Sequence, residues 1–150
     1  MNPIQLSVAQ LSEINLLLVR DRLKEVPVDL GKAKLFLSQA EEAISELGNI
    51  HANQIRFDIA YNSCHSVGEA LLAAYGYRTT PGTGQHIAVG EFLLVLLADN
   101  AAQKAAIEYD LLRETRNGLH YQAKQIGNAQ ADHAISTAQA LLAAARDILN

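Results

Sequence analysis

The side chains best suited to chemistry lie in one stretch, residues 110–124, which reads DLLRETRNGLHYQAK. Arg116 and His120 are four residues apart, and Arg113 precedes Arg116 by three. On a helix these spacings bring side chains to neighbouring positions of one face, so the three heads can converge. Asn117 lies a little further round the same helix. Two guanidinium groups, an imidazole and an amide therefore form a candidate site for handling phosphate.

This set of side chains fits the cleavage of RNA without a metal ion. RNA carries a 2′-hydroxyl that attacks the adjacent phosphorus once it has lost its proton. A histidine, with an ordinary pKa of about 6.5, can move that proton near neutral pH. Arginine stays charged and can stabilise the negative charge that develops on phosphorus. We therefore predict catalytic roles for His120, Arg116 and Arg113, with Asn117 orienting the substrate or the imidazole.

The same spacing has a purely structural interpretation, which is the more common one for charged residues on a helix. Arg116 could pair with Glu108 or Glu114 on a solvated face. The arginine and histidine side chains could also join subunits while remaining buried and hydrogen-bonded. In the second case no open groove would be present.

Helical periodicity places the candidate site in the middle of a long helix. Asn100 and Gln103 have the spacing of a capping box at its start, and Gly127 is expected to end it. Gly118 lies inside this helix, where glycine costs about 1 kcal/mol relative to alanine. Its presence indicates either close approach of another helix or neutral drift. One apolar stripe should face the core: Ala105, Leu112, Leu119, Ala123 and Ile126.

The rest of the chain predicts further helices, over residues 8–24, 30–47, 53–75 (or from Asn49), 86–98 and 129–149. The conspicuous loop covers residues 77–85, where Pro81, Gly82 and Gly84 interrupt any regular pattern. Thr83 is expected to cap the helix that follows. Five or six helices with short connections imply an all-α fold, an antiparallel helical bundle forming one domain over residues 1–150.

The helix expected over residues 53–75 is apolar on several sides and should be central. It also carries a polar stripe of Asp58, Asn62, His65 and Glu69 on neighbouring turns. This stripe could complete a site with the arginine and histidine face, or it could satisfy buried hydrogen bonds. Cys64 has no adjacent base and is interpreted as a small core residue.

Composition narrows the class of function. The formal net charge of −4 excludes a protein that coats nucleic acid by bulk electrostatics, so any RNA contact requires a local basic patch. A single cysteine excludes an internal disulfide and fits a reducing, cytoplasmic location. The N-terminus lacks the features of a signal peptide, and no apolar run is long enough to span a membrane.

The sequence gives no support for a metal or a cofactor. The five histidines are dispersed, without a His-x3-His or Glu-x2-His pair to begin a metal site. The loop sequence PGTGQH lacks both the GxGxxG pattern and the lysine of a P-loop. No metal ligands and no cofactor are therefore expected.

The order of several motifs resembles a bacterial branch of the HEPN superfamily, the higher eukaryotes and prokaryotes nucleotide-binding helical bundles. The similarity spans about residues 50–149, and its most specific part is Arg116-Asn117 followed by His120-Tyr121. The motifs are DIAYN at 58–62, the alanine-rich segment 70–74, GYR at 76–78, GQHI at 84–87 and Leu112-x3-Arg-Asn-x3-Tyr121.

The resemblance implies a dimer that brings together two copies of the helix bearing Arg116. Many members are metal-independent endoribonucleases of toxin–antitoxin or phage-defence systems, with an Arg-x(4–6)-His motif. Here three residues separate Arg116 from His120 and six separate Arg113 from His120, whereas the matching branch carries Arg-Asn-x3-Tyr. Some members are adenylylated by a partner nucleotidyltransferase on a tyrosine near this motif, and Tyr121 has that position.

Sequence and resemblance together predict an RNA-cleaving homodimer, with an antitoxin or nucleotidyltransferase as a possible further partner. The alternative is a non-catalytic dimeric adaptor that binds RNA, a nucleotide or a partner enzyme through the same face. Besides the catalytic candidates, four residues are expected to contribute to binding: Tyr121, Lys124, Asp58 and Asn62.

Overall fold

The computed structural model describes the backbone of residues 1–150 and the side chains of all of them except His120 and Tyr121. Over this described chain it contains six α-helices, one short 3₁₀ helix and a two-stranded sheet, which confirms the expected all-α helical bundle. The elements in chain order are α1 (Val8–Val19), β1 (Leu23–Glu25), α2 (Leu30–Glu46), η1 (Leu47–Asn49), α3 (Asn53–Tyr75), β2 (Tyr77–Thr79), α4 (Gln85–Leu96), α5 (Gln103–Gln122) and α6 (Asn128–Leu149).

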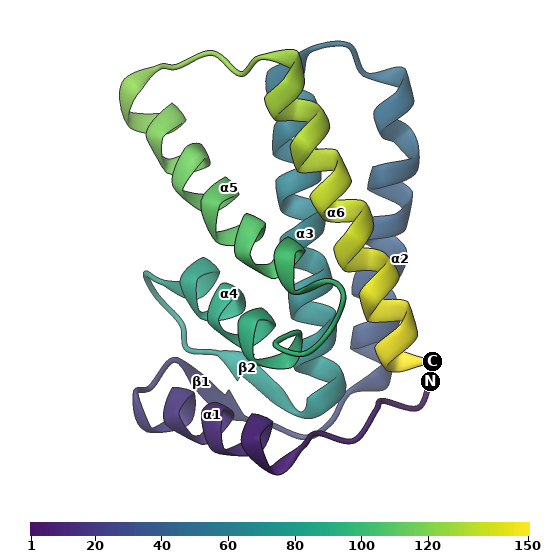
Figure 1. The fold of residues 1–150 in the computed structure, drawn as a ribbon, viewed down its shortest axis with the longest axis vertical. Helices are drawn as coiled ribbons and strands as arrows, with labels where there is room; N and C mark the ends of the chain where they lie inside the picture. The colour runs from purple at the N-terminus through teal and green to yellow at the C-terminus, as the bar shows by residue number, and fades with distance from the viewer.

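The long helices α2, α3 and α6 lie side by side, and α4 and α5 lie against the same central helix α3 (Figure 1). Buried residues are spread along most of α3, including Phe57, Cys64 and Leu71, so this helix is central as expected. The α5 helix diverges from α6 towards its C-terminal end.

The two chain ends lie next to each other at one end of the bundle (Figure 1). The backbone N–H of Asn2 donates to the carbonyl of Leu149 at 3.0 Å, and that of Ile4 donates to Ile148 at 2.9 Å. Residues before α1 are thus held against the end of α6 by backbone hydrogen bonds.

The first helix is shorter than the sequence pattern predicted. It ends at Val19, Asp21 adopts a left-handed backbone with φ of 58°, and residues 23–25 form strand β1. This strand pairs antiparallel with β2, and Leu23 lies opposite Thr79. The helical prediction for residues 20–24 was wrong because pairing with a distant segment prevails over local helical periodicity. The pairing also fixes the start of the loop that leads into α4.

The long helix α5 ends at Gln122, five residues before Gly127, the residue expected to stop it. Ala123 follows the helix with φ of 49°, and Gly127 instead serves as the N-cap of α6. Ala123 is exposed and does not join the apolar stripe, whereas Ile126 reaches the core from the connecting loop. At the other end the N-cap is Ala102, and Asn100 accepts a hydrogen bond from its backbone N–H at 2.8 Å. The expected capping box with Gln103 is not the cap of this helix.

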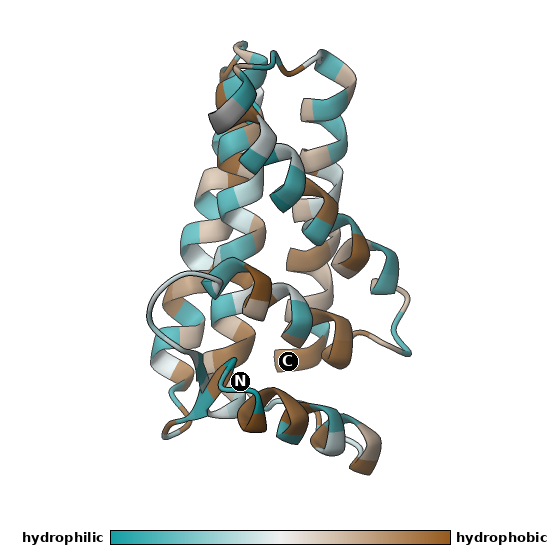
Figure 2. Cartoon of the chain, turned by 90° about the vertical axis from the view of Figure 1, so that its left-hand side faces the viewer, coloured by the Kyte–Doolittle hydropathy of each residue, from teal (hydrophilic) through white to brown (hydrophobic). Residues whose placement is uncertain are grey.

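Hydrophobic residues also appear on the outside of α1. Val8 is 85% exposed and Val19 is 75% exposed, and Figure 2 shows hydrophobic segments along this helix at the bottom of the view. None of the described helices combines the length and the hydropathy required to cross a bilayer.

Two glycines in the helices have opposite surroundings. A Cβ on Gly68 of α3 would overlap Cγ1 of Val89, a fully buried residue of α4. A Cβ on Gly118 of α5 would meet no described atom within 4 Å. Close helix approach therefore explains Gly68, whereas the close approach considered for Gly118 is absent from the described structure.

We expect Gly68→Ala to destabilise the protein by about 1–3 kcal/mol, because Val89 and α4 must move to admit the methyl group. Gly118→Ala is the matched control. It should be neutral or stabilise by up to about 1 kcal/mol through improved helix propensity. Urea unfolding of both variants measures the difference, and equal effects on the free energy of unfolding would contradict the close packing of α3 on α4.

Candidate functional site

A pocket of about 450 Å³ lies where α3, α4 and α5 meet the loop that precedes α4. This volume is within the range of small-ligand sites. Its lining combines arginine, histidine, tyrosine and amide side chains with a glycine-rich backbone. The lining residues are Tyr61, Gly82, Thr83, Gly84, Gln85, His86, Ile87, Arg113, Arg116 and Asn117.

The α5 helix supplies the two guanidinium groups and one amide of the pocket. Arg113, Arg116 and Asn117 are three and four residues apart, which places them on adjoining positions of one helical face. The apolar stripe of the same helix faces inward, with Leu112 and Ala105 buried. The structure thus brings three of the predicted catalytic residues to one pocket.

The start of α4 forms the opposite wall. Gly84 is its N-cap and has φ of 94°, a left-handed conformation that suits glycine, so the chain turns sharply into the helix. Thr83 lies before this cap, and no side chain caps the helix, so its predicted capping function was wrong. His86 is the second residue of α4 and reaches the pocket from this turn.

The two arginines have different environments. Arg113 Nε lies 3.0 Å from Asp110 Oδ1, one turn earlier on α5. Burial lowers the pKa of Arg113, but the hydrogen bond and charge of Asp110 outweigh it and raise that pKa overall. Arg116 instead lies over the ring of Tyr61, with its Cζ 5.2 Å from the ring centroid, a cation–π geometry.

The alternative pairing of Arg116 with Glu108 or Glu114 does not occur among the described side chains. Glu108 Oε2 lies 2.8 Å from His133 Nε2 on α6. Glu114 Oε1 lies 3.9 Å from Arg113 Nη2. Arg116 is therefore directed to the pocket wall rather than to a carboxylate on its own helix.

Behind the pocket lies an aromatic cluster of Tyr61, His65, His86 and Tyr109. Tyr61 Oη and His86 Nδ1 are 2.7 Å apart, and His65 Nδ1 and Tyr109 Oη are 3.1 Å apart. The ring planes are nearly parallel: His65 stacks on His86 with centroids 4.0 Å apart, and Tyr61 stacks on Tyr109 with centroids 5.5 Å apart. The cluster joins α3, α4 and α5 immediately beneath the arginines.

Burial sets the protonation of this cluster. It lowers the pKa of His86 from 6.5 to about 4, helped by the nearby charges of His65 and Arg116. It also raises the pKa of the Tyr61 and Tyr109 hydroxyls above their usual value. At neutral pH the tyrosines are protonated and His86 is an uncharged imidazole that can donate or accept hydrogen bonds.

Only part of the polar stripe predicted on α3 lies close to the pocket. His65 belongs to the aromatic cluster, and its Nε2 lies 3.4 Å from Glu69 Oε1. Asp58 and Asn62 do not line the pocket, and Asn62 is exposed on another side of the helix. The pattern therefore identified the correct helix, but only its second half lies beside the site.

Three other predicted residues lie at or beyond the end of α5. Lys124 is exposed in the loop that connects α5 to α6 and does not line the pocket. His120 and Tyr121 belong to the last turn of α5 by their backbone, and their side chains lie outside the described residues. Their predicted contributions to catalysis and binding stay predictions.

Several residues that line the pocket, among them Tyr61 and His86, were not predicted from the sequence patterns. Tyr61 lines the pocket although it is fully buried in the helix that the sequence describes as apolar on several sides. The segment Gly82–Gly84 was predicted as a loop and rejected as a nucleotide-binding motif, and it was not assigned to the site. One available signal was the four-residue spacing of Tyr61 and His65, which places two hydrogen-bonding rings on one face of an otherwise apolar helix.

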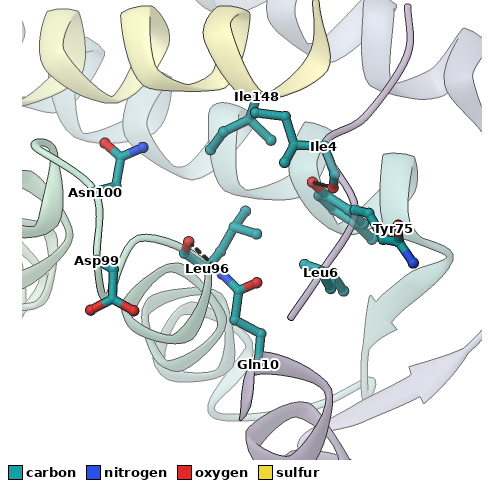
Figure 3. A pocket seen from close by; sticks show the side chains of 9 residues that line it. Ile4, Leu6, Gln10, Tyr75, Leu96, Asp99, Asn100 and Ile148 are labelled. Carbon is teal, nitrogen blue, oxygen red and sulfur yellow. Dashed lines mark hydrogen bonds between the residues drawn. The ribbon is translucent and has the colours of Figure 1, made fainter. Parts of the chain in front are cut away.

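A smaller cavity of about 170 Å³ lies near the chain ends, between α1, α4 and α6 (Figure 3). Gln10 Nε2 donates to the carbonyl of Leu96 at 3.1 Å, and Tyr75 Oη donates to that of Ile4 at 2.6 Å. No lysine, arginine or histidine is among the described residues that line it. The described side chains also include no group of three or more histidine, cysteine or acidic residues placed to hold a metal ion.

The chain matches no protein-family model, no curated protein sequence and no solved structure in comparisons with known proteins. The resemblance to the HEPN superfamily stays a prediction. The chemistry of the pocket is therefore interpreted from its own side chains.

The depressed pKa of His86 predicts a pH dependence of stability. Between pH 6.5 and about 4 the unfolded chain binds a proton at this residue and the folded chain does not, so stability falls as pH falls through this range. His86→Gln cannot titrate and should show a shallower fall. Urea unfolding of both proteins from pH 7.5 to pH 4 measures the difference, and parallel curves would show that His86 is freely protonated in the native state.

Proposed function

We propose that the pocket binds a phosphodiester group of RNA and that the protein cleaves RNA without a metal ion. The observation that carries the proposal is the convergence of Arg113, Arg116 and Asn117 from α5 with His86 from α4 on one pocket. A chain with a net charge of −4 needs a local basic site to bind RNA, and this arrangement provides one.

The pocket offers hydrogen-bond donors suited to a phosphate group. Guanidinium groups bind phosphate oxygens through paired N–H donors and remain charged at any physiological pH. Asn117 adds an amide, and Gln85 adds a second amide on the opposite wall. A volume of about 450 Å³ suits one nucleotide of a single strand more than a duplex, whose bases are stacked and paired.

The proposed reaction is an internal transfer at phosphorus. A base removes the proton of the 2′-hydroxyl, the 2′-oxygen bonds to phosphorus, and the bond from phosphorus to the 5′-oxygen breaks. The leaving 5′-oxygen takes a proton, so the products are a 2′,3′-cyclic phosphate and a 5′-hydroxyl. Arg116 and Arg113 would stabilise the charge on the phosphorus oxygens. His120, one helical turn after Arg116, is the proposed proton-transfer group.

The wider setting of the activity follows from the resemblance to HEPN proteins. It includes a homodimer in the cytoplasm, with the site at the dimer interface, and a toxin–antitoxin or phage-defence system. An antitoxin or a nucleotidyltransferase acting on Tyr121 would be a further partner. Two exposed apolar residues of α5, Ile107 and Leu111, give this helix an outer surface compatible with a second subunit.

A second candidate function is RNA or nucleotide binding without cleavage. His86, the one imidazole that the described residues place in the pocket, has its pKa lowered to about 4 and does not change charge near neutral pH. A non-catalytic adaptor would use the same arginines to hold the ligand. Loss of binding in Arg116→Ala, with no cleavage by the wild type, would identify this function.

We expect purified protein to cut a synthetic RNA in the presence of EDTA and to leave 2′,3′-cyclic phosphate ends. Arg116→Ala and His120→Ala should each lower the rate by about 10²–10⁴, the usual contribution of a positioned charge or proton-transfer group. Gel analysis with end mapping measures this. Cells expressing the wild type and His120→Ala give the same comparison for natural RNA.

Arg146→Ala is the matched control, because Arg146 lies on α6 and pairs with Glu41, away from the pocket. It should retain full activity. The proposed reaction needs a free 2′-hydroxyl. It would be ruled out if RNA with every 2′-hydroxyl methylated were cut as fast as unmodified RNA.

A further inference from the structure

His86 is the pocket residue whose state the geometry specifies most completely. Its Nδ1 lies 2.7 Å from Tyr61 Oη. Either atom can carry the proton of this bond, depending on the tautomer of the imidazole. Among the described hydrogen bonds this is the one that the Tyr61 hydroxyl makes, so its proton has an acceptor if Tyr61 donates to Nδ1. A neutral imidazole then carries its own proton on Nε2.

The groups around His86 oppose its protonation. Besides burial, the electrostatic effects of His65 on α3 and of Arg116 and Arg113 on α5 lower its pKa, and Glu69 opposes them only in part. Its position in the first turn of α4 adds the positive end of a helix dipole. The imidazole thus remains a neutral donor beside the two arginines.

The charges of the two arginines are not equally available. Asp110 lies 3.0 Å from Arg113 and offsets most of its charge. The salt bridges among described side chains include Arg113 but not Arg116, which lies over the Tyr61 ring. The pocket therefore presents about one uncompensated positive charge, together with neutral hydrogen-bond donors.

We propose that the pocket is matched to a singly charged internal phosphodiester, which Arg116 neutralises and to which His86 donates a hydrogen bond through Nε2. Tyr61 is the positioning residue that selects this tautomer of His86. The inference rests on the proposed function and adds the ligand class: an internal diester of a chain rather than a doubly charged terminal phosphate.

The tautomer is tested in the free protein by ¹⁵N NMR of the imidazole of His86 at pH 7. The wild type should show the proton on Nε2, and Tyr61→Phe, which keeps the ring and removes the hydroxyl, should give a mixture of tautomers. A proton on Nδ1 in the wild type would overturn the inference. This measurement requires no ligand, so it is independent of the proposed function.

Ligand class is tested by calorimetry with two uncleavable probes, 2′-O-methyluridine 3′-phosphate and its methyl ester. The wild type should bind both within about threefold, although the first carries about one more negative charge. Asp110→Asn removes the carboxylate that pairs with Arg113. The affinity for the terminal phosphate should then rise about tenfold, while the affinity for the ester changes little. A wild-type preference above tenfold for the terminal phosphate would overturn the proposed match.

The contribution of His86 is measured with the methyl ester. His86→Leu should weaken binding about tenfold or more, since a hydrogen bond to a charged group is lost. His86→Gln should bind within about threefold of the wild type, because its amide N–H can replace Nε2. The ratio of wild-type to Gln affinities should stay constant from pH 8 to pH 6, whereas a ratio that grows at lower pH would mean that His86 binds as a cation.

The two proposals fail in different ways. If neither the wild type nor Arg116→Ala binds single-stranded RNA or either probe, the proposed function is wrong. If the wild type binds RNA through Arg116 but His86→Leu binds equally well, only the contribution of His86 is wrong.

Discussion

The hydrogen bond between Tyr61 and His86 joins the bundle to the pocket. Tyr61 is fully buried in α3, yet its hydroxyl contacts α4, its ring stacks on Tyr109 of α5, and its face lies beneath Arg116. One side chain therefore sets the relative positions of three helices at the point where their functional groups meet. A buried hydroxyl without a partner would be costly, so this contact stabilises the fold and positions the site at once.

The sequence predicted the fold well because helical periodicity and glycine at helix ends are local signals. The bounds of α3 followed from the apolar pattern and from Gly76, whose φ of 81° ends the helix. The strands β1 and β2 could not be predicted, since each has three residues and forms only through pairing across more than fifty residues of chain. The end of α5 was misplaced because Ala123, which has no special preference for the conformation, adopts the left-handed cap.

The part of the candidate site that lies on one helix was predicted, because helical spacing is also a local signal. Arg113, Arg116 and Asn117 share one helix, so their spacing alone was enough to group them. His86 and Tyr61 are far from them in sequence, and only the packing of α4 and α3 on α5 brings them into the pocket. Asp58 and Asn62 were predicted from their regular positions on α3, but neither lines the pocket.

The pairing of the chain ends has a practical meaning for protein engineering. Backbone hydrogen bonds hold residues 2–4 against residues 148–150, and both ends lie at the opposite end of the molecule from the tip of α5 (Figure 1). A short peptide could join them, and the exposed loop at residues 123–125 could then supply new ends in a circular permutant. Fluorescent or affinity fusions at either end of this chain would lie away from the C-terminal turns of α5.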